Sequence, residues 1–231
     1  MKKITVIPAR SGSKGLVDKN ILKIKNIPLF AWSILHAKYY SSENDLIIVS
    51  SDSDNYLEIA KKYGAIPFKR DAKLSLDNTP TEPVMKNVTD NLSVDEDDLI
   101  VLLQPTSPIR KKDTIDRLFE SFKNKNTDSA LTLTKYHKFL WKDHDGYVTP
   151  KESTRPRRQD IKNLFYETGS IYATKYSKFV NSEKRVSGNT KGVFVDFDEV
   201  LEIDNEIEFK IISKFMESFN EWEQELINFQ K

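Results

Sequence analysis

The sequence predicts an α/β protein in which helices cover both faces of a mostly parallel sheet. Short runs of consecutive apolar residues alternate along the chain with segments whose apolar residues recur at helical spacing. Strands that are apolar at every residue are typical of parallel sheets that are buried on both faces. The 231 residues, of which 38% are hydrophobic, are enough for one domain with a sizeable core. We therefore expect a single domain over residues 1–231.

The first half of the chain begins this alternation. A β-branched run that a proline ends predicts a strand over 4–7, and a polar loop follows over 9–20. A helix is expected over 28–40, because a proline stands at its start and its apolar residues fit helical spacing. The aliphatic run 46–49 predicts a second strand, and the Ser and Asp residues after it can cap a helix over 54–63.

The alternation continues after a short strand near Ile66 and a polar, irregular stretch. A helix over 80–92 precedes the aliphatic run 98–103, which predicts the third buried strand. A helix over 111–124 follows, and then a fourth strand over 129–134. Ligands bind at the carboxyl ends of the strands in such sheets, so the loops after the four buried strands should converge on one cleft.

A polar and aromatic stretch interrupts the pattern after the fourth strand. It contains a turn signal at Asp145-Gly146, and it predicts a small inserted arm at about 136–172. The end of that segment, 165–172, is strand-like, and another strand is expected at 193–195. The last helix is expected over 205–229, because one apolar stripe recurs there at helical spacing. The stripe consists of Ile211, Phe215, Phe219, Trp222 and Leu226.

The composition argues against several classes of protein. Lys and Arg number 36 against 35 Asp and Glu, and a formal net charge of +1 argues against bulk nucleic-acid binding. The chain has no cysteine, which excludes disulfides, thiolate nucleophiles and zinc–cysteine sites and agrees with a cytoplasmic location. No run of about 18 apolar residues predicts a membrane span. The first residues contain no long apolar stretch, so we expect no signal peptide.

The first candidate site is the glycine loop after the first strand, Arg10-Ser11-Gly12-Ser13-Lys14-Gly15, with Lys19-Asn20 close behind. Glycine lets backbone N–H groups curl around phosphate oxygens, and the basic side chains offer charges to a polyphosphate. The pattern departs from both the Walker motif and G-x-G-x-x-G. From these residues alone, a solvated loop with incidental lysines is an equal alternative.

This loop and the preceding Ile7-Pro8-Ala9 closely resemble the signature of the CMP-sialic acid synthetases, or acylneuraminate cytidylyltransferases. Three later segments resemble other motifs of the family in the expected order, so the resemblance covers about residues 3–212. They are Leu102-Leu103-Gln104-Pro105-Thr106-Ser107-Pro108-Ile109-Arg110, Arg155-Pro156-Arg157-Arg158-Gln159-Asp160 and Gly169-Ser170-Ile171-Tyr172. The resemblance implies a Rossmann-like nucleotidyltransferase fold and a homodimer formed through the arm.

The resemblance also implies a reaction. The anomeric hydroxyl of a nine-carbon α-keto sugar acid attacks the α-phosphate of CTP and pyrophosphate leaves, with Mg2+ (or Mn2+) assisting. Such transfers depend on positioning and charge neutralisation. The implied nucleotide-binding residues are those of the loop 10–15 together with Asn20, Arg70, Thr81 and Gln104. The implied catalytic residues are Lys19, Gln104 and Asp204. From the residues alone, Gln104 caps the turn before a proline at a strand end.

The arm carries a basic cluster that suits an acidic sugar. Residues 151–162 hold five basic and two acidic side chains, which gives a charge of +3. Arginine binds carboxylates in bidentate fashion. The resemblance implies that Arg158 binds the sugar carboxylate and that Tyr172 forms a wall of the sugar site. It also implies that Lys142 reaches the same site, with Lys138 as the alternative. A solvated charged arm or a dimer contact is the alternative, which we prefer for Arg155 and Arg157.

An acidic segment near the C-terminus offers oxygen ligands for a divalent cation. Mg2+ is bound by hard oxygens, often one or two carboxylates with phosphates and waters. Glu202 and Asp204 alternate, so in a strand they would share a face. The family pattern resembles Asp-Ile-Asp-Thr, with both Asp at the metal, whereas this chain has Glu-Ile-Asp-Asn, which puts Glu202 in more doubt than Asp204. The alternative is a capping box formed by Asn205 and Glu208.

Other functions remain open at this stage. A cytidylyltransferase for an eight-carbon keto-deoxy sugar acid and a nucleotidyltransferase for a sugar 1-phosphate are alternatives, although the latter has less need of Arg158. A non-catalytic nucleotide-binding regulator on the same scaffold is an alternative from a different class. The sequence therefore predicts CTP and a sialic-type sugar acid as partners, with no nucleic acid and no membrane.

Overall fold

A computed structural model describes residues 1–13, 15–136, 138–151, 154, 156–218 and 221–229. Their central feature is a seven-stranded sheet with the strand order β11-β7-β10-β6-β1-β4-β5. Its strands are β1 (Lys3–Pro8), β4 (Leu46–Ser51), β5 (Ile66–Lys69), β6 (Leu99–Leu103), β7 (Ser129–Lys135), β10 (Phe165–Lys175) and β11 (Thr190–Phe194). Only β10 in this sheet runs antiparallel to its neighbours, so the predicted mostly parallel sheet is confirmed.

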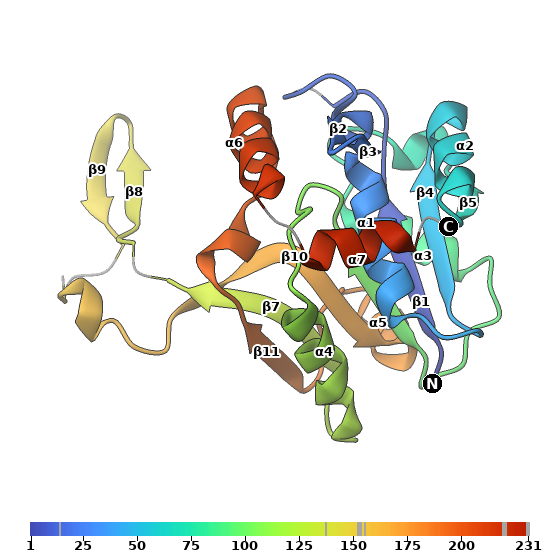
Figure 1. Cartoon of the computed structure of the whole chain (residues 1–231). Coiled ribbons are helices and arrows are strands. Elements are labelled where there is room, and N and C mark those ends of the chain that lie inside the picture. The colour runs from blue at the N-terminus through green and yellow to red at the C-terminus, as the bar shows by residue number, and fades with distance from the viewer. Residues whose placement is uncertain (14, 137, 152–153, 155, 219–220, 230–231) are drawn as a thin grey trace.

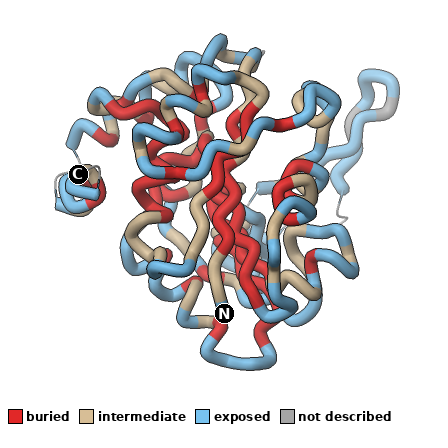
Figure 2. The backbone as a smooth tube through the Cα atoms, turned by 90° about the vertical axis from the view of Figure 1, so that its right-hand side faces the viewer, coloured by how far each residue is buried: buried red, intermediate tan, exposed pale blue. Residues whose placement is uncertain are grey.

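Helices cover both faces of the sheet, as the sequence predicts (Figure 1). One face is covered by α1 (Leu29–Tyr40), α2 (Asp54–Lys62) and α4 (Lys112–Glu120), whose apolar residues form one core cluster with the strands. The other face is covered by α3 (Thr81–Thr89) and α5 (Tyr176–Ser182). Figure 2 shows that the buried part of the chain runs through the middle strands, while the outer turns are exposed. Burial of continuous aliphatic strands between two helical layers is the main source of stability in such a fold.

The predicted strands over 4–7, 46–49, 98–103 and 129–134 correspond to β1, β4, β6 and β7, with β6 beginning one residue later than predicted, so these four predictions are confirmed. The sequence did not predict α5 or the small hairpin of β2 (Lys23–Ile24) and β3 (Ile27–Pro28). Strands of two residues are too short to show any alternation, and the turn between them carries Lys25 and Asn26 at positive φ without a glycine to mark it.

The prediction of one helix over 205–229 is wrong. The segment forms α6 (Glu206–Glu217) and α7 (Glu221–Asn228), which run in different directions (Figure 1). On α6 the buried residues are Ile212 and Met216, whereas Ile211 of the expected stripe is 55% exposed. On α7 the indole N–H of Trp222 donates to the carbonyl of Arg110 over 2.7 Å. Apolar spacing alone did not separate one long helix from two short ones.

The inserted arm is a separate hairpin of β8 (Trp141–His144) and β9 (Tyr147–Pro150), which projects away from the central sheet (Figure 1). The predicted turn at Asp145-Gly146 lies at its tip, with both residues at positive φ. The arm is shorter than the expected 136–172, because β10 begins at Phe165 and pairs with β7 in the central sheet. Among the described residues, no helix combines the length and the apolar character that crossing a bilayer requires.

Candidate active site

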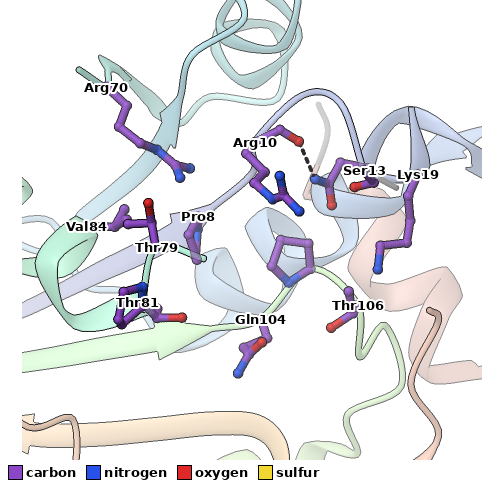
Figure 3. A pocket seen from close by; sticks show the side chains of 13 residues that line it. Pro8, Arg10, Ser13, Lys19, Arg70, Thr79, Thr81, Val84, Gln104 and Thr106 are labelled. Atoms are coloured by element: carbon purple, nitrogen blue, oxygen red, sulfur yellow. Dashed lines mark hydrogen bonds between the residues drawn. The ribbon is translucent and has the colours of Figure 1, made fainter. Parts of the chain in front are cut away.

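A pocket of about 180 Å³ opens at the carboxyl ends of β1 and β6 (Figure 3). The loop after β1 contributes Arg10 and Ser13, and the loop after β6 contributes Gln104 and Thr106. The segment between β5 and α3 completes the lining with Arg70 and other residues. The predicted convergence of four loops is correct in part. The loop after β4 supports the pocket from behind, and the loop after β7 leads into the arm instead of lining it.

The glycine loop is held in place by side chains from outside it. The backbone N–H and the hydroxyl of Ser11 both donate to the Asp52 carboxylate, over 2.8 and 2.6 Å. The Asn20 amide donates to the carbonyl of Arg10 over 2.9 Å. Burial alone would raise the pKa of Asp52, but the two bonds from Ser11 hold it below its usual value. This role of Asp52 is not predicted from the sequence. The feature that could have indicated it is the position of Asp52 directly after a buried strand.

Three cationic side chains surround the pocket. Arg10 pairs with Asp77 over 2.5 Å, and Lys19 pairs with Asp204 over 3.0 Å. Arg70 is only 5% exposed and donates to the carbonyl of Ser50 over 2.6 Å. Burial lowers its pKa to about 10, so it remains charged at neutral pH. The structure therefore brings together three cations from two separate parts of the chain, the loop after β1 and the end of β5, as binding of a polyphosphate requires.

Gln104 lies at the end of β6 with its side chain in the pocket (Figure 3). Its main chain is fixed by Arg110, whose guanidinium donates to the carbonyls of Gln104 and Ser170 over 2.6 and 3.1 Å. The same guanidinium donates to Ser33 of α1 over 3.2 Å. Arg110 is 2% exposed, and burial lowers its pKa to about 9. Arg110 is the last residue of the segment 102–110 that resembles a family motif, but the sequence does not predict this role for it.

The acidic residues Glu202 and Asp204 lie next to Lys19, and Figure 3 shows Lys19 across the pocket from Arg70. They do not occupy a strand, so the expected shared strand face is wrong. Glu202 is half-buried and accepts a bond of 3.4 Å from Ser107. Burial, and then the charge of Asp204, raises the pKa of Glu202. The predicted capping box is confirmed, since Asn205 accepts from the N–H of Glu208 over 3.0 Å and Glu208 accepts in return.

The two carboxylates of this acidic pair fit a cation that takes the rest of its ligands from outside the protein. Two carboxylates close to each other, one of them half-buried with a single weak donor, are an unfavourable arrangement that a divalent cation would stabilise. Within the described ranges no three His, Cys, Asp or Glu side chains form a metal-binding group. The chain therefore offers oxygen ligands for part of a Mg2+ coordination shell, with the rest left to phosphate oxygens and water.

Two further predicted residues lie on the other side of Gln104. Thr81, at the start of α3, lines the pocket. Tyr172 is 2% exposed and lies opposite Leu102 in the sheet, so its ring is beneath the surface next to the pocket rather than in its lining. The guanidinium of Arg185 lies over this ring, 5.3 Å from its centroid. The sequence analysis did not predict Arg185.

The predicted residues of the arm are not brought to the pocket of the same chain. Lys142 is exposed on β8, and Arg158 belongs to a short 3-10 helix (Arg158–Asp160) beyond the hairpin, away from the pocket (Figure 1). The side chain of Arg158 and the whole of Lys14 lie outside the described residues, so their predicted roles stay predictions.

Sequence comparisons identify the family. A family model described as Cytidylyltransferase matches residues 4–227. Post-translational flagellin modification protein B of Campylobacter coli is 30% identical over 227 residues, which cover 94% of this chain and 96% of that protein. The chain belongs to the cytidylyltransferase family. This cytidylyltransferase is therefore a nucleotidyltransferase, and the predicted membership of the CMP-sialic acid synthetase type is confirmed.

Two further relatives of this cytidylyltransferase carry names that include their sugar acid. Pseudaminic acid cytidylyltransferase of Campylobacter jejuni subsp. jejuni serotype O:2 is 30% identical over 181 residues, which cover 74% of this chain and 78% of that protein. N-acylneuraminate cytidylyltransferase of Streptococcus agalactiae serotype V is 30% identical over 218 residues, which cover 90% of this chain and 52% of that protein.

The fold also matches solved structures. CMP:2-keto-3-deoxy-manno-octonic acid synthetase complexed with CTP superposes with a TM-score of 0.68 at 14% identity, covering 94% of this chain and 99% of that one. 4-Diphosphocytidyl-2C-methyl-D-erythritol synthase gives the same TM-score at 12% identity, covering 93% and 98%. At such low identity these matches concern the fold, and they confirm the predicted Rossmann-like α/β architecture.

The contact between the glycine loop and the acidic segment can be tested at Gly15. A Cβ atom at this position would lie 2.4 Å from the backbone carbonyl oxygen of Asp204, so one of the two segments must move. We expect Gly15→Ala to lower the free energy of unfolding by about 1–3 kcal/mol, measured by urea denaturation. Ser13→Ala in the same loop is the control and should change it by less than about 0.5 kcal/mol. Equal stability of the two variants would contradict the close approach.

Proposed function

We propose that this cytidylyltransferase transfers CMP from CTP to the anomeric hydroxyl of a nonulosonic, sialic-type sugar acid and releases pyrophosphate. The carrying observation is the pocket at the ends of β1 and β6, where Arg10, Lys19 and Arg70 line the same cavity as Gln104 and an acidic pair lies next to Lys19. The names of the Campylobacter jejuni and Streptococcus agalactiae relatives support a sugar acid of this class. In the reaction the hydroxyl oxygen bonds to the α-phosphorus, the bond to the pyrophosphate oxygen breaks, and a base accepts the hydroxyl proton, for which the candidate is the Asp204 carboxylate.

The pocket residues have distinct proposed roles. Arg10, Lys19 and Arg70 neutralise the triphosphate, and the backbone N–H groups of the glycine loop, which Asn20 and Asp52 hold in shape, surround its oxygens. Thr81 lines the same pocket, and its proposed role is to contact the ribose or base. Gln104 stands between nucleotide and sugar, and its fixed main chain keeps the amide in position for attack.

We further propose that Glu202 and Asp204 hold Mg2+, or Mn2+, when CTP is bound. A cation there supplies positive charge to the phosphate oxygens on which negative charge accumulates in the transfer. Asp204 is 70% exposed at its side chain and pairs with Lys19, so it is available to exchange this partner for a cation. Ser107 donates to Glu202 and so holds this second, half-buried carboxylate in place.

The test of this function is pyrophosphate release by the purified protein with Mg2+. CTP, ATP, GTP and UTP are compared, each with a panel of nine-carbon sugar acids and one eight-carbon keto-deoxy acid. Release with CTP and a nine-carbon acid supports the proposal. Release only with the eight-carbon acid would replace the sugar class, and CTP binding without release under any condition would overturn enzymatic transfer by this chain.

The acidic pair can be tested by Asp204→Asn, which removes a charge without changing the size of the side chain. We expect kcat to fall by about 100-fold or more, because one element of transition-state charge stabilisation is lost. Asp196→Asn is the matched control, since Asp196 is an exposed residue of the same acidic segment that pairs with Lys111. Unchanged turnover in Asp204→Asn across a Mg2+ titration would exclude Asp204 from both cation binding and proton removal.

We propose a homodimer formed through the arm. A two-stranded hairpin alone is marginally stable in water, yet its aromatic residues are open to solvent, with Trp141 49% and Tyr147 82% exposed. We expect sedimentation equilibrium to give about twice the chain mass of 26.8 kDa. The double variant Trp141→Asp with Tyr147→Asp should give the monomer mass, whereas Phe197→Asp, at a 76% exposed residue of the main body, should not. A monomeric wild type would overturn this proposal.

A further inference from the structure

An ion pair that the CTP site does not use lies next to the pocket. Arg185, between α5 and β11, donates from its Nε to the carboxylate of Glu82 over 2.6 Å. Both side chains are half-buried, with 23% and 24% exposed. Glu82 stands in the first turn of α3, so the pair joins two segments that are 103 residues apart in the sequence. A half-buried arginine and carboxylate cost desolvation energy, which makes their joint placement beside a pocket notable.

The pair lies beside Tyr172, which the family resemblance assigns to the sugar site, and away from the glycine loop. Thr81, the neighbour of Glu82, lines the pocket. Arg185 covers the ring of Tyr172, and Tyr172 pairs across the sheet with Leu102 of β6, two residues before Gln104. The glycine loop and its cations lie beyond Gln104 on the other side (Figure 3).

The local charge at this place does not suit a carboxylate ligand. Glu167 lies close enough to Tyr172 and Arg185 for its charge to act on both. One guanidinium therefore faces two carboxylates, those of Glu82 and Glu167, which leaves a net charge of −1. An incoming sugar carboxylate would be repelled by this arrangement. A neutral group that offers both a hydrogen-bond acceptor and a donor is compatible with it.

A secondary amide is such a group. Its carbonyl oxygen accepts from a guanidinium, and its N–H donates to a carboxylate. Among the described residues, the hydrogen bond of the Arg185 side chain runs from Nε to Glu82, so the two terminal nitrogens keep their N–H groups for a ligand. We propose that Arg185 and Glu82 recognise an N-acylamino substituent of the sugar acid and thereby determine which sugar acids this enzyme accepts. This inference rests on the proposed function.

The experiment compares two nine-carbon sugar acids that share the C1 carboxylate. One carries an N-acylamino group, and the other is its deaminated relative with a hydroxyl at that carbon. For Arg185→Met and Glu82→Gln we expect kcat/KM for the N-acylated acid to fall by about 10- to 100-fold, as for loss of a hydrogen bond to a charged group. The kcat/KM for the deaminated acid should change by less than about threefold, and KM for CTP should stay the same. Arg185→Lys keeps the charge but not the planar fork, so it should restore only part of the loss.

A matched control is available on α4. Arg117 also donates from Nε to a carboxylate, that of Asp113, over 2.7 Å, but on an exposed surface away from the pocket. Arg117→Met should leave both sugar acids and KM for CTP unchanged.

The outcomes separate this inference from its alternatives. An equal loss for both acids would overturn it in favour of carboxylate binding, because the carboxylate is common to the two substrates. A change in KM for CTP together with a lower midpoint of thermal unfolding would overturn the inference. The ion pair would then have a purely structural role, in which it connects α3 to the 183–189 loop. Unchanged kinetics in the two variants would overturn the inference directly. If the wild type turns over neither acid, the proposed function itself has failed.

Discussion

The buried guanidinium of Arg110 is the interaction on which the geometry of the pocket depends. β6 ends at the pocket next to an antiparallel strand whose pairing shifts register between Glu167 and Tyr172. At this junction the carbonyl of Ser170 accepts from the N–H of Gln104, and the carbonyl of Gln104 accepts from the N–H of Ser107. The guanidinium of Arg110 donates to both carbonyls as well and so bridges them. Because hydrogen bonds from a charged donor are stronger than neutral ones, this bridge holds the two strand ends at a fixed separation. The bond from Trp222 to the Arg110 carbonyl then ties α7, the last helix, to the same point.

The candidate site is assembled from distant parts of the chain through a few close approaches. Gly15 admits the backbone of Asp204, and Gly169 admits the carboxylate of Glu202, whose oxygen lies where a Cβ atom would be. These contacts carry the acidic segment to the N-terminal loop, where Lys19 meets Asp204. The capping box at Asn205 fixes the point at which this segment turns into α6. One stretch of chain therefore serves helix initiation and the candidate cation site together, so the two interpretations of the sequence are compatible.

Local chemistry was enough to predict the central strands, the glycine loop and the Asn205 cap, because each depends on residues that are neighbours in the sequence. The division between α6 and α7 could not be predicted, since apolar spacing continues across it and α7 is held by the bond from Trp222 to Arg110, 112 residues apart. Asp52, Arg110 and Arg185 were missed for the same reason: each of them binds at least one partner that lies 41 to 103 residues away in the sequence. The roles of Lys142 and Arg158 were inferred from resemblance, and the fold places that part of the chain outside the pocket.

The arm leaves and re-enters the fold at one place. It connects β7 to β10, which are neighbours in the sheet, and the N–H of Tyr136 still bonds to the carbonyl of Leu164 where the two strands separate. The sheet therefore closes the base of the arm by itself, and the length of chain beyond that base has little effect on the strands that build the pocket. Insertions, deletions or an exchanged hairpin can be accommodated there without moving Gln104 or the glycine loop. The arm is thus a replaceable module, which can change while the chemistry of the pocket is kept.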